Sequence, residues 1–220
     1  MLSEKLDQVQ NRIAAAAAHA GRGTDEILLI AVTKKFAPSV ICEAYQAGLR
    51  HFGENYVQEF ADKSATLANL SGARFHLIGH LQSNKTKKAA HLFSSIDSID
   101  SAKLAARLDS EAKSIETMIE VKLSDEESKS GAAPADLPAI AEAIRASRNL
   151  KLVGLMTVPP WSEDAELSRP YFARLRELAG QYSIPELSMG MSNDLEVAIE
   201  EGATAVRVGT ALFGKRKKDA

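Results

Sequence analysis

The chain alternates between two patterns of hydrophobic and polar positions. Short apolar runs rich in β-branched residues predict buried parallel strands, and the stretches between them, with apolar residues three or four positions apart, predict helices. Strands are expected at 27–33, 50–54, 74–78, 92–99, 116–123, 151–156, 185–188 and 205–208. Helices are expected at 3–19, 38–47, 57–70, 84–90, 101–113, 136–146, 162–179 and 192–202. The predicted helix caps are Ser3, Ser101 and Ser192.

The eight strand–helix alternations predict an α/β fold. Parallel strands need crossover connections, and eight strands can close a (β/α)8 TIM-type barrel, here with an extra N-terminal helix. An open doubly wound sheet is the alternative, because periodicity alone does not prove closure. No Pro/Gly-rich linker or low-complexity tract interrupts the chain, so we expect a single domain over residues 1–220.

Composition narrows the classes of function. The chain is 45% hydrophobic and 25% charged with a net charge of −2 at pH 7, so no general attraction to nucleic acid or an anionic membrane is expected. Cys42 is the only cysteine, which excludes an internal disulfide and fits a reducing compartment. The chain lacks a signal-like N-terminus and any apolar run of the ~18 residues that a membrane span needs. We expect a cytoplasmic protein and, without an evident exposed apolar stripe, a monomer.

A pair of lysines ends the first predicted strand. Lys34 and Lys35 follow the apolar run 27–33 and precede Pro38, which suits the first turn of a helix. The carboxyl ends of parallel strands are where α/β folds place their chemistry. Burial there favours the neutral amine, which is the form of lysine that attacks aldehydes. A strand that merely ends in water is the alternative for an isolated pair.

Two turns near the C-terminus predict a phosphate site. Ser192 stands before a helix, and Gly209 with Thr210 follows the last strand, the usual places of the phosphate cradle in such barrels. Each turn alone could be only a cap or a turn. Arg207 alternates with two valines, so its side chain faces opposite to theirs and, if buried, needs an acceptor. That acceptor could be Glu54 or a ring nitrogen of a ligand.

An aldehyde-reactive lysine, a phosphate cradle and an arginine for a ring nitrogen together describe pyridoxal 5′-phosphate (PLP). The sequence resembles the pyridoxal-phosphate homeostasis protein family, single-domain relatives of the alanine racemase barrel. The resemblance covers nearly the whole chain in the family's order. It rests on the stretches 31–34, 52–59, 76–85, 128–131, 154–156, 187–192 and 206–214.

The resemblance implies roles for individual residues. Lys34, not Lys35, would carry the Schiff base, and Arg207 would face the pyridine nitrogen. The phosphate would be held by Ser192, Gly209 and Thr210. The cofactor would be lined by Asn55, Ser188 and Met189. Phe36 departs from the pattern, because many relatives have a basic residue there.

Arginine at the pyridine nitrogen disfavours catalysis. Arginine cannot donate a proton to the ring, and a neutral ring is a poor sink for a carbanion. Racemases with this arginine use a second domain and a partner's tyrosine, whereas this chain ends soon after the eighth strand and only Tyr56 is expected near the barrel mouth. We therefore expect a cofactor-binding protein without catalytic residues that buffers PLP or delivers it to PLP-dependent apo-enzymes. A minimal PLP-dependent racemase is the alternative, and a Schiff-base aldolase without cofactor is a third.

Other signals predict less. His76 and His80 are four residues apart, but across a strand and its loop this spacing does not favour a metal site. Lys129, in a polar loop, could be a second aldehyde-reactive amine, although a surface lysine is the simpler interpretation. Residues 215–218 are expected to form a solvated basic tail.

Overall fold

The computed structural model describes residues 1–126 and 129–214, and the predicted basic tail 215–218 lies outside them. Eight parallel strands close into a barrel in sequence order, so the (β/α)8 prediction is confirmed and the open doubly wound sheet is excluded. Each strand pairs with its neighbours, and β1 pairs with β8. The strands are β1 Leu28–Val32, β2 His51–Glu54, β3 Arg74–Leu77, β4 Ser95–Ile99, β5 Ile115–Glu120, β6 Leu150–Met156, β7 Glu186–Ser188 and β8 Ala205–Val208.

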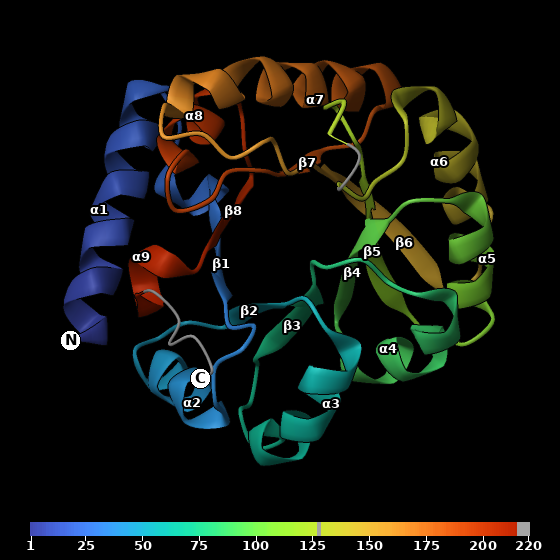
Figure 1. The fold of residues 1–220 in the computed structure, drawn as a ribbon, viewed down its shortest axis with the longest axis horizontal. Coiled ribbons are helices and arrows are strands. Elements are labelled where there is room, and N and C mark those ends of the chain that lie inside the picture. Colours follow the sequence, from blue (N-terminus) through green and yellow to red (C-terminus); the bar gives the residue numbers. More distant parts are fainter. Residues whose placement is uncertain (127–128, 215–220) are drawn as a thin grey trace.

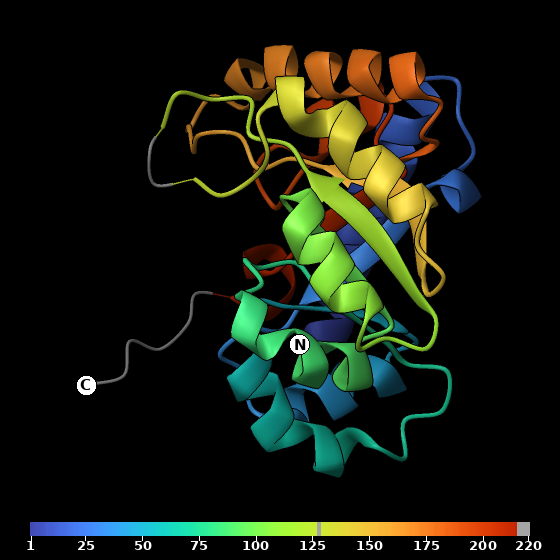
Figure 2. The same ribbon diagram turned by 90° about the vertical axis from the view of Figure 1, so that its right-hand side faces the viewer.

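Helices surround the barrel (Figure 1). Figure 2 shows α5 (green), α6 (yellow) and α7 (orange) on the outside of the strands. The helices are α1 Leu2–His19, α2 Pro38–Gln46, α3 Val57–Ser64, α4 Thr86–Leu92, α5 Ala102–Asp109, α6 Leu137–Arg145, α7 Arg169–Tyr182, α8 Leu195–Glu200 and α9 Thr210–Phe213. Within the described part of the chain, no helix combines the length and apolar character needed to cross a bilayer.

The hydrophobic core lies between the barrel and its helices. Along β8, Val206 and Val208 point outward into this core, while Arg207 between them points into the barrel. The same alternation places Thr33 and Glu54 outside the barrel wall and Lys34 and Asn55 at its mouth. The core therefore sets the register that brings polar side chains to one end of the barrel.

Several predicted element boundaries were wrong. Helix α1 begins at Leu2 with Met1 as its N-cap, so Ser3 lies inside the helix rather than capping it. The run 92–99 is not a continuous strand, because Leu92 still belongs to α4 and β4 begins at Ser95. The helix predicted from 162 begins only at Arg169, after a 3-10 turn. Each error concerns an apolar residue or hydroxyl that suits two neighbouring elements, which periodicity cannot separate.

The two remaining serine caps had different outcomes. The hydroxyl of Ser101 accepts a hydrogen bond from the Leu104 amide at 3.3 Å, so that cap is confirmed. Ser192 does not cap α8, whose N-cap residue is Asp194. Asp194 is buried, and its Oδ1 accepts a hydrogen bond from the Met191 amide at 2.6 Å. Ser192 is therefore left for another role.

Candidate functional site

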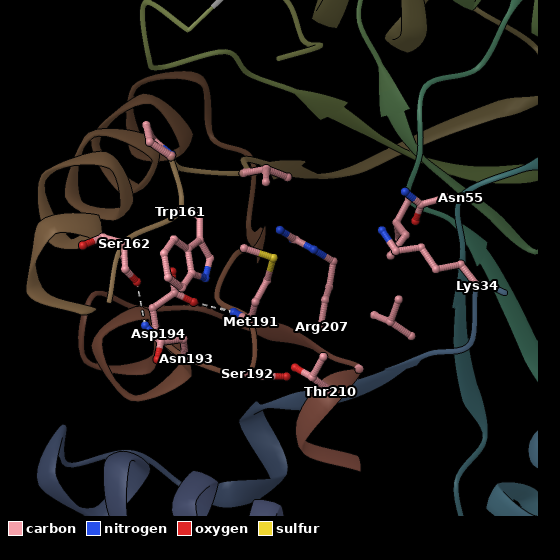
Figure 3. A pocket seen from close by; sticks show the side chains of 15 residues that line it. Lys34, Asn55, Trp161, Ser162, Met191, Ser192, Asn193, Asp194, Arg207 and Thr210 are labelled. Carbon is pink, nitrogen blue, oxygen red and sulfur yellow. Dashed lines mark hydrogen bonds between the residues drawn. The ribbon is translucent and has the colours of Figure 1, made fainter. Parts of the chain in front are cut away.

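A pocket of about 370 Å³ opens at the carboxyl ends of the strands, in the size range of small-molecule sites. Its lining includes six of the residues predicted from the sequence, drawn from both ends of the chain, and all but Gly209 are labelled in Figure 3. These six are Lys34, Asn55, Ser192, Arg207, Gly209 and Thr210. Residues remote in sequence are thus brought to one cavity by barrel closure.

Lys34 reaches the pocket from the turn after β1. The turn holds Lys34 partly buried and in the pocket lining, whereas Lys35 is exposed and lies outside that lining. Lys35 has a φ of 63°, a left-handed conformation that bulky side chains seldom adopt. Phe36, where many relatives have a basic residue, packs against Phe213 with 5.2 Å between the ring centroids. The turn thus directs one lysine of the pair inward.

Arg207 is 4% exposed, and its hydrogen bonds go to neutral oxygens. One guanidinium nitrogen donates to the Ser188 carbonyl at 2.6 Å and to the Ser188 hydroxyl at 2.8 Å. The other donates to the Thr157 carbonyl at 2.8 Å. The suggested partner Glu54 is wrong, because the Glu54 carboxylate lies outside the barrel wall and pairs with Lys63 at 2.8 Å. The arginine is therefore held in place without a carboxylate in contact.

Acidic side chains, among them the buried Glu120, act on Arg207 through space. Burial lowers the pKa of Arg207, and the charges of Glu120 and Asp97 oppose that shift. Burial raises the pKa of Glu120 to about 7, against the lowering influence of Arg207. Glu120 is 7% exposed, and its Oε2 has no hydrogen-bond partner among the described residues. Near neutral pH this carboxyl group is only partly ionised and cannot fully cancel the charge of Arg207.

The turns after β7 and β8 meet at Ser192. The Ser192 hydroxyl accepts a hydrogen bond from the Ala211 amide at 3.2 Å, which joins the two turns. The Ser192 carbonyl accepts from Arg12 of α1 at 3.0 Å, and Arg12 also pairs with Glu196 at 2.6 Å. Helix α9 starts at Thr210, so the first backbone amides of that helix adjoin the Ser192 hydroxyl. Hydroxyl and amide donors of this kind suit a phosphate group.

Asn55 forms the wall opposite the phosphate-type donors (Figure 3). Its Oδ1 is buried and has no hydrogen-bond partner among the described residues. A Cβ at Gly79 would lie 2.4 Å from the Asn55 carbonyl oxygen, so the chain after β3 passes this backbone at a distance that only glycine permits. An unsatisfied buried oxygen in a pocket wall is a candidate ligand contact.

The other predicted site residues lie outside this lining. Ser188 is fully buried beneath Arg207, which it contacts, and Met189 is fully buried in the hydrophobic core. Lys129 lies 4.0 Å from Glu126 and is also outside the pocket lining. Among residues 1–126 and 129–214, no group of three or more histidine, cysteine or acidic side chains is arranged to hold a metal ion.

His76 and His80, whose spacing did not favour a shared metal site, have different partners. His76 lies 3.3 Å from Asp97 inside the barrel, and His80 lies 3.3 Å from Asp100 at the rim. His76 also contacts His51 at 2.9 Å, and burial together with the charge of His76 lowers the pKa of His51 to about 4. His51, His76 and Asp97 thus contact one another inside the barrel. Neither this group nor His80 belongs to the lining of the pocket that contains Lys34.

Sequence reasoning missed two features of the pocket. Trp161, the only tryptophan, is 72% exposed at the rim, on the segment between β6 and α7. Asp194 supports the β7–α8 turn through Met191 and through the Ser168 hydroxyl at 2.9 Å. The prolines at 159 and 160 mark a loop after a strand end, which could have indicated the rim position of Trp161. The role of Asp194 depends on a contact 26 residues away, and no local pattern reveals that contact.

The chain resembles proteins already known. Residues 5–217 match the family model described as alanine racemase, N-terminal domain. A "Pyridoxal phosphate homeostasis protein" of Pseudomonas aeruginosa is 46% identical over 221 residues, covering 98% of this chain and 96% of that protein. The protein of the same name from Aquifex aeolicus is 44% identical, covering 97% of this chain and 98% of that protein.

Solved structures agree with these relatives. PipY of Synechococcus elongatus, described as having PLP bound, superposes with a TM-score of 0.85 at 39% identity, covering 97% of this chain and all of that one. An alanine racemase of Corynebacterium glutamicum has a TM-score of 0.70 at 17% identity, covering 96% of this chain and 61% of that one, and shares the fold. The chain therefore belongs to the pyridoxal phosphate homeostasis protein family, built on the N-terminal domain of the alanine racemases.

Proposed function

We propose that this protein binds PLP through a Schiff base on Lys34 and holds it for buffering or delivery without converting amino acids. The observation that carries this proposal is the meeting of Lys34, Arg207 and the Ser192–Thr210 cradle in one pocket. The PLP-bound PipY structure, a close relative in sequence and fold, adds support.

The pocket residues fit the groups of PLP. Lys34 supplies an amine for the aldehyde, and the hydroxyls of Ser192 and Thr210 supply donors for the phosphate. Arg207 supplies N–H donors to an unprotonated ring nitrogen, and Asn55 supplies a buried oxygen that has no partner among the described residues. Val32 and Ile78 add apolar surface for a flat ring. The cavity thus holds the donor set, the amine and the apolar walls that this cofactor needs.

The covalent step is a condensation and needs no oxidant. Lys34 would supply the neutral amine, and its condensation with an aldehyde would form a C=N bond while both amine protons leave with the aldehyde oxygen as water. When bound, PLP supplies an electron sink for amino-acid carbanions, but only strongly when its ring nitrogen is protonated. Arg207, which the Ser188 and Thr157 carbonyls hold in place, carries N–H donors alone and would therefore leave that nitrogen unprotonated.

Besides Lys34, the described lining of the pocket offers no second base free of other contacts. Of the described lining residues, the ionisable ones are Lys34, Asp194 and Arg207, and Asp194 is already engaged by Met191 and Ser168. Tyr56 is 51% exposed and lies outside this lining. A minimal racemase, the alternative function, would need a second acid–base group to act on the α-carbon. An aldolase without cofactor would leave Arg207 and the phosphate-type donors unused.

The wider role follows from the site. We infer that the domain 1–220 acts as a monomer in the cytoplasm and that apo-enzymes requiring PLP are its recipients. The pocket opens to solvent beside the exposed Trp161, which allows the cofactor to enter and leave.

The test separates carrier from enzyme. Protein loaded with PLP is incubated with L-alanine and other amino acids in deuterated water, and racemisation and α-deuterium uptake are followed. We expect turnover to stay at the level of free PLP, because loss of a general base alone costs about 10²–10⁴ in rate. A PLP-requiring apo-enzyme mixed with the loaded protein should regain activity. Rapid racemisation or α-exchange that depends on Lys34 would make the protein an enzyme.

A further inference from the structure

A buried group of charged side chains lies behind β1, on the far side of the barrel wall from the pocket. Lys63 of α3 is 6% exposed, and its amine lies 2.8 Å from Glu54 and 3.0 Å from Glu59. Glu54 is fully buried, and burial raises the pKa of its carboxyl group. Burying Lys63 and Glu54, with Glu59 partly exposed beside them, is costly unless their contacts give something in return. None of the three lines the pocket.

The contacts of this group bracket Lys34. The Lys63 amine donates to the Thr33 carbonyl at 3.3 Å and to the Phe36 carbonyl at 3.4 Å. Thr33 lies immediately before Lys34, and Phe36 lies two positions after it. A single side chain therefore holds both ends of the turn that presents Lys34.

The carboxylates hold the middle of the same turn. Glu59 accepts a hydrogen bond from the Lys35 amide at 2.6 Å, and Glu54 accepts one from the Thr33 hydroxyl at 2.6 Å. Lys35 has its φ at 63°, a conformation that is unfavourable for a lysine and persists only when its surroundings impose it. Glu59 and Lys63 are four residues apart, so they occupy one face of α3 and act on the turn together.

We propose that Lys63 and Glu59 are positioning residues that set the backbone of the Lys34 turn, so that the Lys34 amine meets an aldehyde carbon in the pocket. This inference rests on the proposed function and deepens it. The direction of the Lys34 side chain is fixed by the backbone torsions of its turn, and the contacts to residues 33, 35 and 36 fix those torsions. The phosphate-type donors at Ser192 and Thr210 belong to β7–α8 and β8–α9 and do not depend on this group.

Two variants and one control test the proposal. Lys63→Met keeps the apolar stem and removes the donor, and Glu59→Gln removes the charge of a residue that is partly exposed. Lys103→Met on the exposed face of α5 is the control. For each protein, the rate of covalent attachment of PLP is measured by trapping with borohydride and mass spectrometry. The affinity for pyridoxine 5′-phosphate, which has an alcohol in place of the aldehyde, is measured separately.

We expect covalent attachment to slow at least about tenfold in Lys63→Met and Glu59→Gln, because small misplacements of a reacting group cost up to about 10²-fold. Affinity for pyridoxine 5′-phosphate should stay within about twofold, since the pocket itself is unchanged. The control should match the original protein in both measurements.

Three results would refute the positioning role. In the first, both variants attach PLP at the original rate. In the second, a variant loses covalent attachment and pyridoxine 5′-phosphate affinity to the same extent. In the third, the control Lys103→Met also attaches PLP slowly. Should Lys63→Met fail to fold, Glu59→Gln decides alone, because that side chain is only partly buried. If the original protein attaches no PLP at Lys34, the proposed function itself fails, which is a separate outcome.

Discussion

The two sides of the pocket each depend on a buried cation, but one cation contacts carboxylates and the other contacts neutral oxygens. Behind the Lys34 turn, the Lys63 amine lies 2.8 Å and 3.0 Å from two carboxylates. On the opposite side, the hydrogen bonds of Arg207 go to the carbonyl and hydroxyl of Ser188 and the carbonyl of Thr157. Within the described residues, no carboxylate forms an ion pair with Arg207.

The difference distinguishes a cation that supports a backbone turn, Lys63, from a cation that faces the ligand pocket, Arg207. The carboxylates cancel the charge of Lys63, so it can fix a backbone turn without attracting ligands. Neutral oxygens position Arg207, and acidic groups such as Glu120 and Asp97 act on its charge only through space. In a site of low dielectric, such a charge acts strongly on an anionic ligand. In the proposed function, one side of the pocket places an amine and the other holds a phosphorylated ring.

Removing the amine should separate the two sides most completely. We predict that Lys34→Ala abolishes covalent attachment of PLP, while the protein stays folded and still binds PLP through the Arg207 side. Mass spectrometry after borohydride reduction should find the pyridoxyl group on Lys34 in the original protein and nowhere in the variant. Lys35→Ala is the matched control and should behave like the original protein. An adduct mainly on Lys35 or Lys129 would overturn the assignment.

The residues that line the pocket could be predicted from the sequence. Strand ends in a parallel barrel converge on one mouth, so Lys34, Asn55 and Arg207 follow from where three apolar runs stop. Alternation with two valines predicted that Arg207 faces opposite to them, and therefore into the barrel if the valines face the helices. The same reasoning could not identify the acceptors of Arg207, because the Ser188 and Thr157 carbonyls are backbone groups that carry no sequence signal.

The residues that support the turns around the pocket could not be predicted in the same way. Nothing about Lys63 distinguishes it from a surface lysine of an amphipathic helix, since its burial depends on how α3 packs against β1. Ser192 was expected to cap a helix, but the cap is Asp194, and the choice is made by contacts with Met191 and Ser168. Local patterns identify which residues could act, whereas tertiary contacts decide which residue supports which.

The phosphate-type donors should account for most non-covalent recognition. Charge-assisted hydrogen bonds contribute about 1.5–3 kcal/mol each, so two or three of them should separate PLP strongly from pyridoxal. In the Lys34→Ala background, Ser192→Ala and Thr210→Ala should each weaken PLP binding by about tenfold or more and leave pyridoxal binding unchanged. Ser162→Ala, at the rim of the same pocket, is the control. Similar affinities for PLP and pyridoxal in titrations would contradict this prediction.

Glu120 offers the smallest and sharpest test, because it is a buried carboxyl group whose charge acts on Arg207 through space. Its pKa is raised from 4.5 to about 7 by burial, so the folded state holds the proton more tightly than the unfolded state does. The stabilisation is complete below pH 4.5 and is lost as pH rises through about 7. At about 1.4 kcal/mol per pKa unit, the loss is at most about 3 kcal/mol.

Glu120→Gln cannot ionise, so its stability should fall less than that of the original protein between pH 5 and pH 8. Urea unfolding at the two pH values measures this difference, and Glu142→Gln on the exposed face of α6 serves as the control. If the original protein and Glu120→Gln lose stability in parallel, Glu120 does not titrate in this window. In that case the weak neutralisation of Arg207 near neutral pH cannot be attributed to a protonated carboxyl group. The contrast between the two cations would then rest on distance alone.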